Sequence, residues 1–268
     1  MKLYLVRHGQ TDWNKEKRLQ GQEDIPLNDF GRHLAKETGV GLRNVRFNLC
    51  FSSDLKRALE TASLILDEGS SKVPIIMDKR LKEIAFGEWE GKSVARNQME
   101  VPDEFLKFYD DPEHFAGAPG GESFAEVKER TDDFLKWLVG QEEYGDKNIL
   151  LVTHGVALAT LLNNIKKAPL SELWAGSIHK NCAVTEVEIK DGEMQILSEN
   201  QVYYEESVRN VVWGISYAFS PILDYMIAAV FMKLVSFITT VPFALLMAAR
   251  FVNILLGLGT VWLALDMG

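Results

Sequence analysis

Short apolar runs alternate with amphipathic stretches along the first three quarters of the chain. The apolar runs have the length of buried strands, whereas the apolar positions of the amphipathic stretches recur with helical spacing. This alternation predicts an α/β fold with a mostly parallel central sheet and helices on both faces. Strands are expected directly before Arg7 and over 47–51, 73–77, 148–153 and 183–189, and helices over 28–42, 54–66, 102–109, 122–139 and 156–165. Ser52, Ser53 and Asp54 are candidate caps for the helix that follows them.

The carboxyl-terminal part of the chain has a different pattern. Residues 207–268 contain three basic and two acidic side chains, so the net charge of −9 for the whole chain becomes −10 for the part before them. Two stretches, 210–232 and 242–265, hold one charged residue each and are long enough to cross the hydrocarbon core of a membrane. We therefore expect a globular domain over 1–206 and a hydrophobic helical hairpin of two transmembrane helices over 207–268.

The few charges of this tail suggest how it is arranged. Asp224 lies eight residues before the end of the first span and Arg250 eight residues after the start of the second, so a symmetric hairpin would pair them. An even number of spans and Arg209 at the first boundary favour a globular domain on the cytoplasmic face. Two other interpretations stay open: a module for homo-oligomerisation, or an extension that associates with membranes only peripherally.

Composition excludes several other classes of protein. The net charge of −9 argues against a nucleic-acid partner. The two cysteines, Cys50 and Cys182, have neither metal nor redox spacing, which fits a reducing compartment and no disulfide framework. No signal peptide is visible after Met1. The sequence also lacks a Walker-type loop and a zinc motif, so neither a cofactor nor a metal is expected.

Candidate chemistry lies where two of the expected strands end. The first strand runs into Arg7-His8-Gly9, and the strand over 148–153 runs into His154-Gly155. Loops at the carboxyl ends of parallel strands form the ligand crevice of open α/β sheets, so the two histidines are expected to meet there. Arg7 offers a planar cation that suits phosphate, and Gly9, which has no Cβ, is expected to let a substrate group or the backbone approach His8 closely.

Five motifs in a fixed order are more specific than either strand end. They are Arg7-His8-Gly9, the Ser-Ser-Asp-Leu-x-Arg-Ala-x-x-Thr-Ala stretch around Arg57, the Glu-x-x-Phe-Gly-x-Trp-Glu-Gly stretch from Glu83, Gly-Gly-Glu-Ser over 120–123, and Thr153-His154-Gly155. In this order they resemble the histidine phosphatase superfamily, which has the phosphoglycerate mutase-like fold, over residues 1–205.

The resemblance implies a role for each matched position. His8 would accept the phosphoryl group, and Glu83 would be the proton donor, with Glu88 and Glu90 as rival carboxylates. The residues that would bind the phosphate or lie near the substrate are Arg7, Arg57, His154, Asn14, Gln20 and Gly21. For Asn14, capping of a turn is an equal alternative. His33, His114 and His179 belong to no motif and are expected to be structural or exposed, whereas Asn181 is expected to orient a neighbouring loop.

This chemistry is coherent on physical grounds. Cationic groups around a phosphomonoester dianion stabilise the charge on its oxygens, and a neutral imidazole can form a phosphohistidine, which divides one difficult displacement into two easier ones. The second ring nitrogen of His8 needs an acceptor, such as a nearby backbone carbonyl, to hold the reactive tautomer. Glu83 would protonate the leaving oxygen and then accept a proton from the attacking water, which requires a raised pKa near the dianion.

Within the family the sequence favours hydrolysis of a small phosphorylated metabolite over mutase chemistry. The interval between Glu83 and His154 is short, and Phe-Gly-Glu-Trp-Glu-Gly resembles the phosphatase branch with its broad-specificity and alpha-ribazole phosphatases. A mutase, or a non-catalytic scaffold that binds phosphorylated ligands, stays open. The proline- and glycine-containing stretch over 92–121 is expected to cross the mouth of the site and help to choose the leaving group. Its aromatic residues Phe105, Phe108, Tyr109 and Phe115 would form an apolar wall or simply core.

Overall fold

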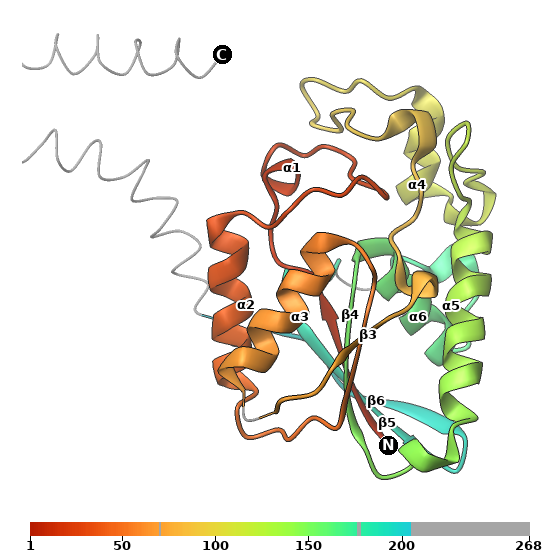
Figure 1. The fold of residues 1–268 in the computed structure, drawn as a ribbon. Helices are drawn as coiled ribbons and strands as arrows, with labels where there is room; N and C mark the ends of the chain where they lie inside the picture. The colour runs from red at the N-terminus through yellow and green to blue at the C-terminus, as the bar shows by residue number, and fades with distance from the viewer. Residues whose placement is uncertain (70, 176–177, 205–268) are drawn as a thin grey trace, which may run out of the picture. The chain divides into compact units, whose positions relative to one another are not determined.

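The computed structural model describes residues 1–69, 71–175 and 178–204. These residues form one six-stranded sheet in the order β3-β2-β4-β1-β5-β6 (Figure 1). β1 pairs in parallel with β4, and β2 pairs in parallel with β3 and β4, whereas β5 is antiparallel to both β1 and β6. The predicted α/β fold is therefore confirmed, with a mixed sheet in which three strand pairings are parallel and two are antiparallel. The strands are β1 (Lys2–Arg7), β2 (Leu49–Ser52), β3 (Ile75–Met77), β4 (Asn148–Thr153), β5 (Val184–Lys190) and β6 (Glu193–Gln201).

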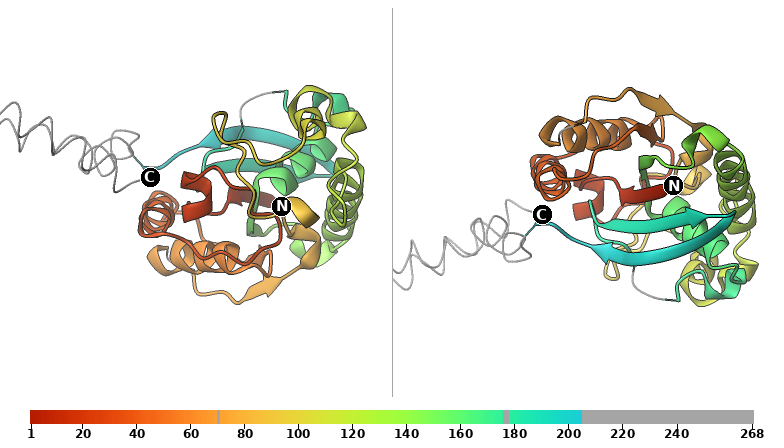
Figure 2. Two further views of the ribbon diagram at one scale, coloured as in Figure 1. Left: turned by 90° about the horizontal axis from the view of Figure 1, so that it is seen from above. Right: turned by 90° about the horizontal axis from the view of Figure 1, so that it is seen from below.

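Alternation of side chains along β1 explains why helices cover both faces of the sheet. Leu3 and Leu5 point into a core that packs on α5 and α6, whereas Tyr4 and Val6 point into a core that packs on α2 and α3. Since successive side chains of a strand face opposite sides, a strand of continuous apolar residues is stable only when both sides are covered. Figure 2 shows the sheet between the two pairs of helices, which are α2 (Asp29–Gly41), α3 (Lys56–Glu68), α5 (Phe124–Val139) and α6 (Gly155–Ile165).

Two of these four helices begin with a local cap, whereas the N-cap residues of α3 and α6 have no capping side chain. Asn28 caps α2 by accepting from Gly31 N, and Ser123 forms a capping box with Glu126 at the start of α5. The expectation that Ser52, Ser53 or Asp54 caps α3 is wrong, because the helix begins at Lys56 and its N-cap residue, Leu55, has no capping side chain. The backbone N–H of Lys56 instead donates to the carboxylate of Asp24, 2.7 Å away in a distant loop.

The excursion over 92–121 packs above the sheet edge at which β1 and β4 end (Figure 1). It contains short helices rather than the single helix expected over 102–109. Its buried rings join Trp89, Phe124 and Leu173 in a separate apolar cluster. The remaining short helices of the described residues are α1 (Asp12–Lys15), α4 (Lys107–Asp110) and the 3₁₀ helices Lys79–Leu81, Gly87–Trp89, Asp103–Leu106, Pro112–His114, Glu142–Tyr144 and Leu170–Glu172.

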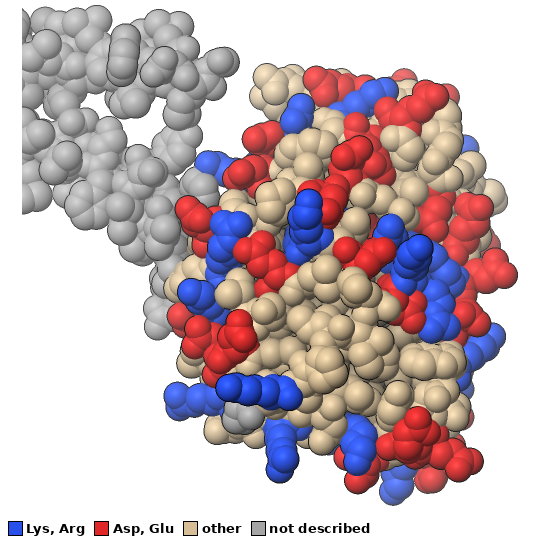
Figure 3. Space-filling model, in the orientation of Figure 1, with Lys and Arg blue, Asp and Glu red and all other residues tan. Residues whose placement is uncertain are grey.

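The tail expected to form two membrane helices lies outside the described residues, as do Arg209, Asp224 and Arg250. Within the described part of the chain, no helix combines the length and the apolar character that a membrane crossing requires. The boundary after residue 206 stays a prediction. On the face of the described residues seen in Figure 3, acidic and basic side chains are interspersed rather than gathered into a basic patch.

Candidate active site

The two histidines that follow β1 and β4 lie next to each other. Arg7 and Thr153 are register partners of the adjacent parallel strands, so the residue after each strand emerges at the same sheet edge. The rings of His8 and His154 have a centroid separation of 5.0 Å and are both buried. The convergence expected from the sequence is therefore present in the structure.

The imidazole of His8 is anchored by its own loop. Its Nδ1 lies 2.6 Å from the carbonyl oxygen of Gly9, so that nitrogen carries the proton and Nε2 keeps the free lone pair. Burial lowers the pKa of His8 well below its usual value, and the nearby cations Arg57 and Arg7 lower it further. His8 is consequently neutral at pH 7, as a nucleophile must be.

Arg57 reaches the same place from the first turn of α3. Its side chain is fully buried, and two of its nitrogens donate to the backbone carbonyls of Glu23 and Gly21 at 2.7 Å each. Burial lowers its pKa to about 10, which still leaves the guanidinium charged at neutral pH. Arg57 is thus a rigid cation, oriented by the loop that carries Gly21.

Arg7 is held in a similar way from the other side. Its Nη1 donates to the backbone carbonyl of His179 at 2.6 Å, and burial lowers its pKa. Arg7 Nε, Arg57 Nε and both ring nitrogens of His154 are buried and have no hydrogen-bond partner among the described residues. Buried polar groups are normally paired, so this convergence of unpaired groups is suited to a ligand with several anionic oxygens.

Glu83 lines a pocket together with Arg7, His8 and Arg57, and its carboxylate lies at the start of α6. Its carboxylate accepts hydrogen bonds from the backbone N–H groups of Gly155, Val156 and Ala157, at 2.9, 3.0 and 3.2 Å. The helix N-terminus is a favourable place for a negative group, and it aims this carboxylate at the pocket that also contains Arg7 and His8. Glu83 therefore lines the same pocket as His8, Arg7 and Arg57, and His154 lies behind it, next to the ring of His8.

The two rival carboxylates lie elsewhere. Glu88 is exposed and does not line the pocket. Glu90 Oε1 accepts from the backbone N–H groups of Gln22 and Phe86, so it holds two loops together. Gly21 has a φ of +51°, and a Cβ there would lie 2.1 Å from Glu90, which explains the glycine at this position.

Asn14, Gln20 and Gly21 all line the pocket, but their polar atoms are partly engaged. Asn14 Oδ1 accepts from the backbone N–H of Thr11 and completes a capping box for α1, while the Thr11 hydroxyl donates to Gln20 Oε1 at 2.9 Å. Asn14 thus caps a turn and also lines the pocket, and its contact with phosphate stays a prediction. The Gly21 carbonyl points to Arg57 and positions that cation.

Of the two reasons expected for Gly9, close approach of the backbone is the one that the structure supports. A Cβ on Gly9 would lie 2.6 Å from the carbonyl oxygen of Gly31 in α2, so this glycine is required by packing of the loop against the helix. The contact could not be read from the sequence, because it joins a strand end to a helix that follows later.

Arg130 is a supporting residue that the sequence motifs did not reveal. It forms a two-pronged ion pair with Glu122 of the Gly-Gly-Glu-Ser motif, at 2.8 and 3.0 Å. The same guanidinium donates to the backbone carbonyls of Arg80, Lys82 and Glu83. Arg130 and Glu122 therefore fix the backbone that presents Glu83. Its only sequence signal is its place eight residues after Glu122, on the helix that this motif begins.

The outer part of the pocket is apolar. Tyr109 and Phe108 of the excursion face Trp174, whose indole N–H donates to the backbone carbonyl of Phe108 at 2.5 Å. Phe105 and Phe115 are buried core, so the aromatic residues of the excursion divide between wall and core. This placement agrees with the expectation that the excursion crosses the mouth.

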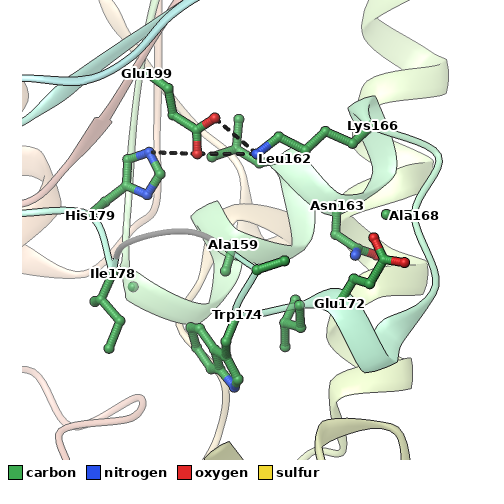
Figure 4. A pocket seen from close by; sticks show the side chains of 13 residues that line it. Ala159, Leu162, Asn163, Lys166, Ala168, Glu172, Trp174, Ile178, His179 and Glu199 are labelled. Atoms are coloured by element: carbon green, nitrogen blue, oxygen red, sulfur yellow. Dashed lines mark hydrogen bonds and ion pairs between the residues drawn. The ribbon is translucent and has the colours of Figure 1, made fainter.

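A second pocket adjoins the first across Trp174 and Ile178 (Figure 4). Glu199 forms an ion pair with Lys166 at 2.9 Å in this pocket and lies 3.9 Å from the ring of His179. Burial lowers the pKa of His179, whose ring nitrogen lies 3.0 Å from the Thr185 hydroxyl. His179 is thus structural, while His33 is partly exposed and His114 pairs with Asp111 at the surface.

Comparisons with known proteins agree with this geometry. The model of the histidine phosphatase superfamily (branch 1) matches residues 3–202. A 2,3-bisphosphoglycerate-dependent phosphoglycerate mutase from Cytophaga hutchinsonii is 31% identical over 180 residues, 62% of this chain and 77% of the relative. A glucosyl-3-phosphoglycerate phosphatase from Mycolicibacterium vanbaalenii is 36% identical over 166 residues, 60% of this chain and 72% of the relative. A solved structure of a candidate alpha-ribazole-5'-P phosphatase from Escherichia coli has a TM-score of 0.66 at 26% identity, covering 76% of this chain and 99% of that one.

Two histidines at the carboxyl edge of the sheet, with Arg7 and the buried Arg57 beside them, form an arrangement suited to phosphoryl transfer. The chain belongs to the histidine phosphatase superfamily, as the match over three quarters of its length shows. Its relatives include both phosphatases and mutases, so the choice between these reactions depends on the site itself.

Proposed function

We propose that this protein is a phosphomonoester hydrolase that acts on a small phosphorylated metabolite through a phosphohistidine at His8. The observation that carries the proposal is the neutral imidazole of His8, with Nδ1 bound to Gly9, beside the unpaired nitrogens of Arg7, Arg57 and His154. His8 supplies a nucleophile, Arg7 and Arg57 supply the positive charge that a phosphoryl transition state requires, and His154 offers unpaired ring nitrogens.

The reaction divides into two displacements at phosphorus. In the first, the lone pair on His8 Nε2 forms the N–P bond, the P–O ester bond breaks, and protonated Glu83 gives its proton to the departing oxygen. In the second, the Glu83 carboxylate takes a proton from water, the water oxygen forms a bond to phosphorus, and the N–P bond breaks. Inorganic phosphate leaves and His8 and Glu83 return to their starting states.

Hydrolysis is favoured over mutase chemistry by the short interval between Glu83 and His154. A mutase must keep water away from its phosphohistidine, which a bisphosphate primer forms before isomerisation begins. The test is a panel of phosphoglycerates, sugar phosphates, nucleotides, alpha-ribazole phosphate and an aryl phosphate, assayed for released phosphate and for isomerised product. We expect phosphate release without a primer. Isomerisation of a phosphoglycerate that depends on added bisphosphate would support the mutase instead.

Replacing Glu83 by glutamine is expected to lower kcat by roughly 10²-fold, a typical contribution of general acid–base catalysis. Glutamine keeps an oxygen that can accept from the start of α6 but supplies no proton. The loss should be smallest for an aryl ester, whose leaving oxygen needs little protonation, and with that substrate phosphohistidine should accumulate. Measurement requires kcat for alkyl and aryl esters together with trapped phosphoprotein.

Glu88→Gln is the matched control for this prediction, because Glu88 belongs to the same segment and is exposed. It should retain the parent kcat. Glu90→Gln should mainly lower the melting temperature, since Glu90 bridges Gln22 and Phe86. A variant of Glu88 or Glu90 that reproduces the leaving-group dependence expected for Glu83→Gln would assign the acid to that residue.

We also propose that the hydrophobic tail tethers this enzyme to the cytoplasmic face of a membrane. The proposal is supported by the two apolar stretches over 210–232 and 242–265. It predicts that the full chain partitions into the detergent phase, whereas a chain ending at Glu206 stays in the aqueous phase with its activity intact. A full chain that is monodisperse without detergent would favour the oligomerisation module.

A further inference from the structure

The peptide group between His8 and Gly9 is bound at both of its polar atoms by side chains from distant parts of the chain. Asn181, in the loop before β5, donates its side-chain N–H to the carbonyl oxygen of His8 at 2.9 Å. Thr61, in α3, accepts the backbone N–H of Gly9 on its hydroxyl oxygen, also at 2.9 Å. The plane of this peptide is thus held from two sides.

This peptide controls the nucleophile because the next carbonyl, that of Gly9, binds His8 Nδ1 at 2.6 Å. A neutral imidazole carries one proton, and the acceptor on one nitrogen decides which nitrogen keeps its lone pair. The Gly9 carbonyl belongs to the following peptide, so loss of the contacts that hold the His8–Gly9 peptide would leave the loop free to move this carbonyl away from the ring. The proton could then occupy Nε2, and that nitrogen would lose the lone pair needed for attack on phosphorus.

Each of the two side chains is itself fixed. The Thr61 hydroxyl donates to the carbonyl of Arg57 at 2.6 Å, so its oxygen lone pairs remain free to accept from Gly9. Thr61 therefore links the backbone of Arg57 to the loop of His8, in a position that is fully buried.

The loop of Asn181 is held by three hydrogen bonds to other parts of the chain. The Tyr204 hydroxyl donates to the Asn181 carbonyl at 2.9 Å, and the N–H of Cys182 donates to the carbonyl of Arg7 at 2.8 Å. Thr38 in α2 donates its hydroxyl to the Cys182 carbonyl at 3.1 Å. Such an arrangement positions the Asn181 amide without requiring the side chain to touch a substrate.

We infer that Thr61 and Asn181 are positioning residues that hold His8 in the tautomer with the proton on Nδ1 and Nε2 free to attack phosphorus. The inference rests on the proposed phosphohistidine mechanism. It also extends that mechanism, because it assigns the orientation of the nucleophile to two side chains outside the phosphate-binding group. Thr61 and Asn181 act through the backbone, so their loss should affect the chemical step more than the binding of phosphate.

The experiment compares the full-length Thr61→Val and Asn181→Ala variants with the parent. Valine keeps the shape of threonine but cannot accept from Gly9, and alanine removes the amide donor. We expect kcat to fall roughly 10-fold to 100-fold, the cost of a small misplacement of a catalytic group. The inhibition constant of inorganic phosphate should stay within about twofold, because Arg7, Arg57 and His154 are unchanged. Selective ¹⁵N labelling of the histidines should show His8 shifting from the Nδ1–H form toward a mixture of tautomers.

The matched controls are Thr131→Val and Asn164→Ala. Thr131 is a buried threonine whose hydroxyl donates within α5, and Asn164 donates its amide to the Lys128 carbonyl. Both should leave kcat and the His8 tautomer as in the parent. Thr61→Ser keeps the hydroxyl and should have most of the parent kcat, in contrast to Thr61→Val. If Asn181→Ala does not fold, the comparison of these two variants still tests the role of Thr61.

Two results would overturn the inference. The first is an unchanged His8 tautomer in folded Thr61→Val. The second is a fall in kcat accompanied by an equal rise in the inhibition constant of inorganic phosphate, as expected for general loosening of the pocket. Failure of the proposed function looks different. In that case the parent protein would release no phosphate from any ester, while the nitrogen spectra would still report whether Thr61 and Asn181 set the tautomer.

Discussion

Replacing His8 by alanine is expected to abolish hydrolysis of phosphomonoesters, with a loss of roughly four orders of magnitude or more, as for removal of other covalent nucleophiles. The methyl group of alanine cannot form the N–P bond. A water molecule in place of the ring would not be oriented for attack, because His8 is oriented through its second nitrogen, Nδ1, which lies 2.6 Å from the Gly9 carbonyl oxygen. Binding should survive, because Arg7, Arg57 and His154 remain. Steady-state rates and trapping of phosphoprotein during turnover measure the two effects separately.

The trapping experiment also identifies the acceptor. Label should appear on His8 in the parent and be absent from His8→Ala, and it should have the acid lability and alkali stability of a phosphoramidate. His33→Ala is the matched control, since His33 is a partly exposed helix residue near Glu37 and lies outside the pocket. Label on His154 in the parent, or an unchanged rate in His8→Ala, would contradict the mechanism.

The parts of the fold that could be predicted are those encoded locally. β1 and β4 are continuous apolar runs, and their covered faces follow from the alternation of side chains along a strand. Because each run ends directly in a histidine, the meeting of His8 and His154 needed only the further assumption that the two strands are neighbours. The structure makes them register partners.

Other features depend on contacts between distant segments and have no local signal. Asp24 rather than Asp54 binds the start of α3. Asp24 follows Glu23, whose carbonyl accepts from Arg57, so the loop of these two residues lies against the first turn of the helix. Gly9 is a glycine because α2 packs against it. Arg130 supports Glu83 from a helix that begins after the excursion. Each depends on which segments become neighbours, and the periodicity of apolar residues does not encode that.

The roles of the acidic residues show the same division. Glu83, Glu88 and Glu90 lie within one short stretch, and their spacing alone does not separate them. The separation comes from α6, whose N-terminal N–H groups hold the carboxylate of Glu83, and from Gln22, whose N–H holds Glu90. The different roles of Glu83 and Glu90 therefore follow from the backbone N–H groups that each carboxylate binds.

Replacing Arg57 by methionine is expected to lower kcat/KM by roughly 10³-fold, at the upper end of the effect of one preorganised charged donor. The side chain is fully buried, so water cannot take over the role of its charge. Its other two nitrogens donate to the carbonyls of Gly21 and Glu23, and Nε has no partner among the described residues. Inorganic phosphate should inhibit the variant much more weakly and should no longer raise its melting temperature. This behaviour contrasts with the positioning residues Thr61 and Asn181, which should spare phosphate binding.

Arg57→Lys tests whether charge alone is sufficient. Lysine restores a cation but has one nitrogen in place of a planar fork, so it cannot bind the carbonyls of Gly21 and Glu23 and also face the pocket. We therefore expect less than a tenth of the parent kcat/KM. Arg32→Met is the matched control, because Arg32 is a helix arginine that pairs with Glu60 and Asp29 outside the pocket, and it should behave as the parent. Full activity in Arg57→Lys would mean that the oriented fork is dispensable and that positive potential alone drives the reaction.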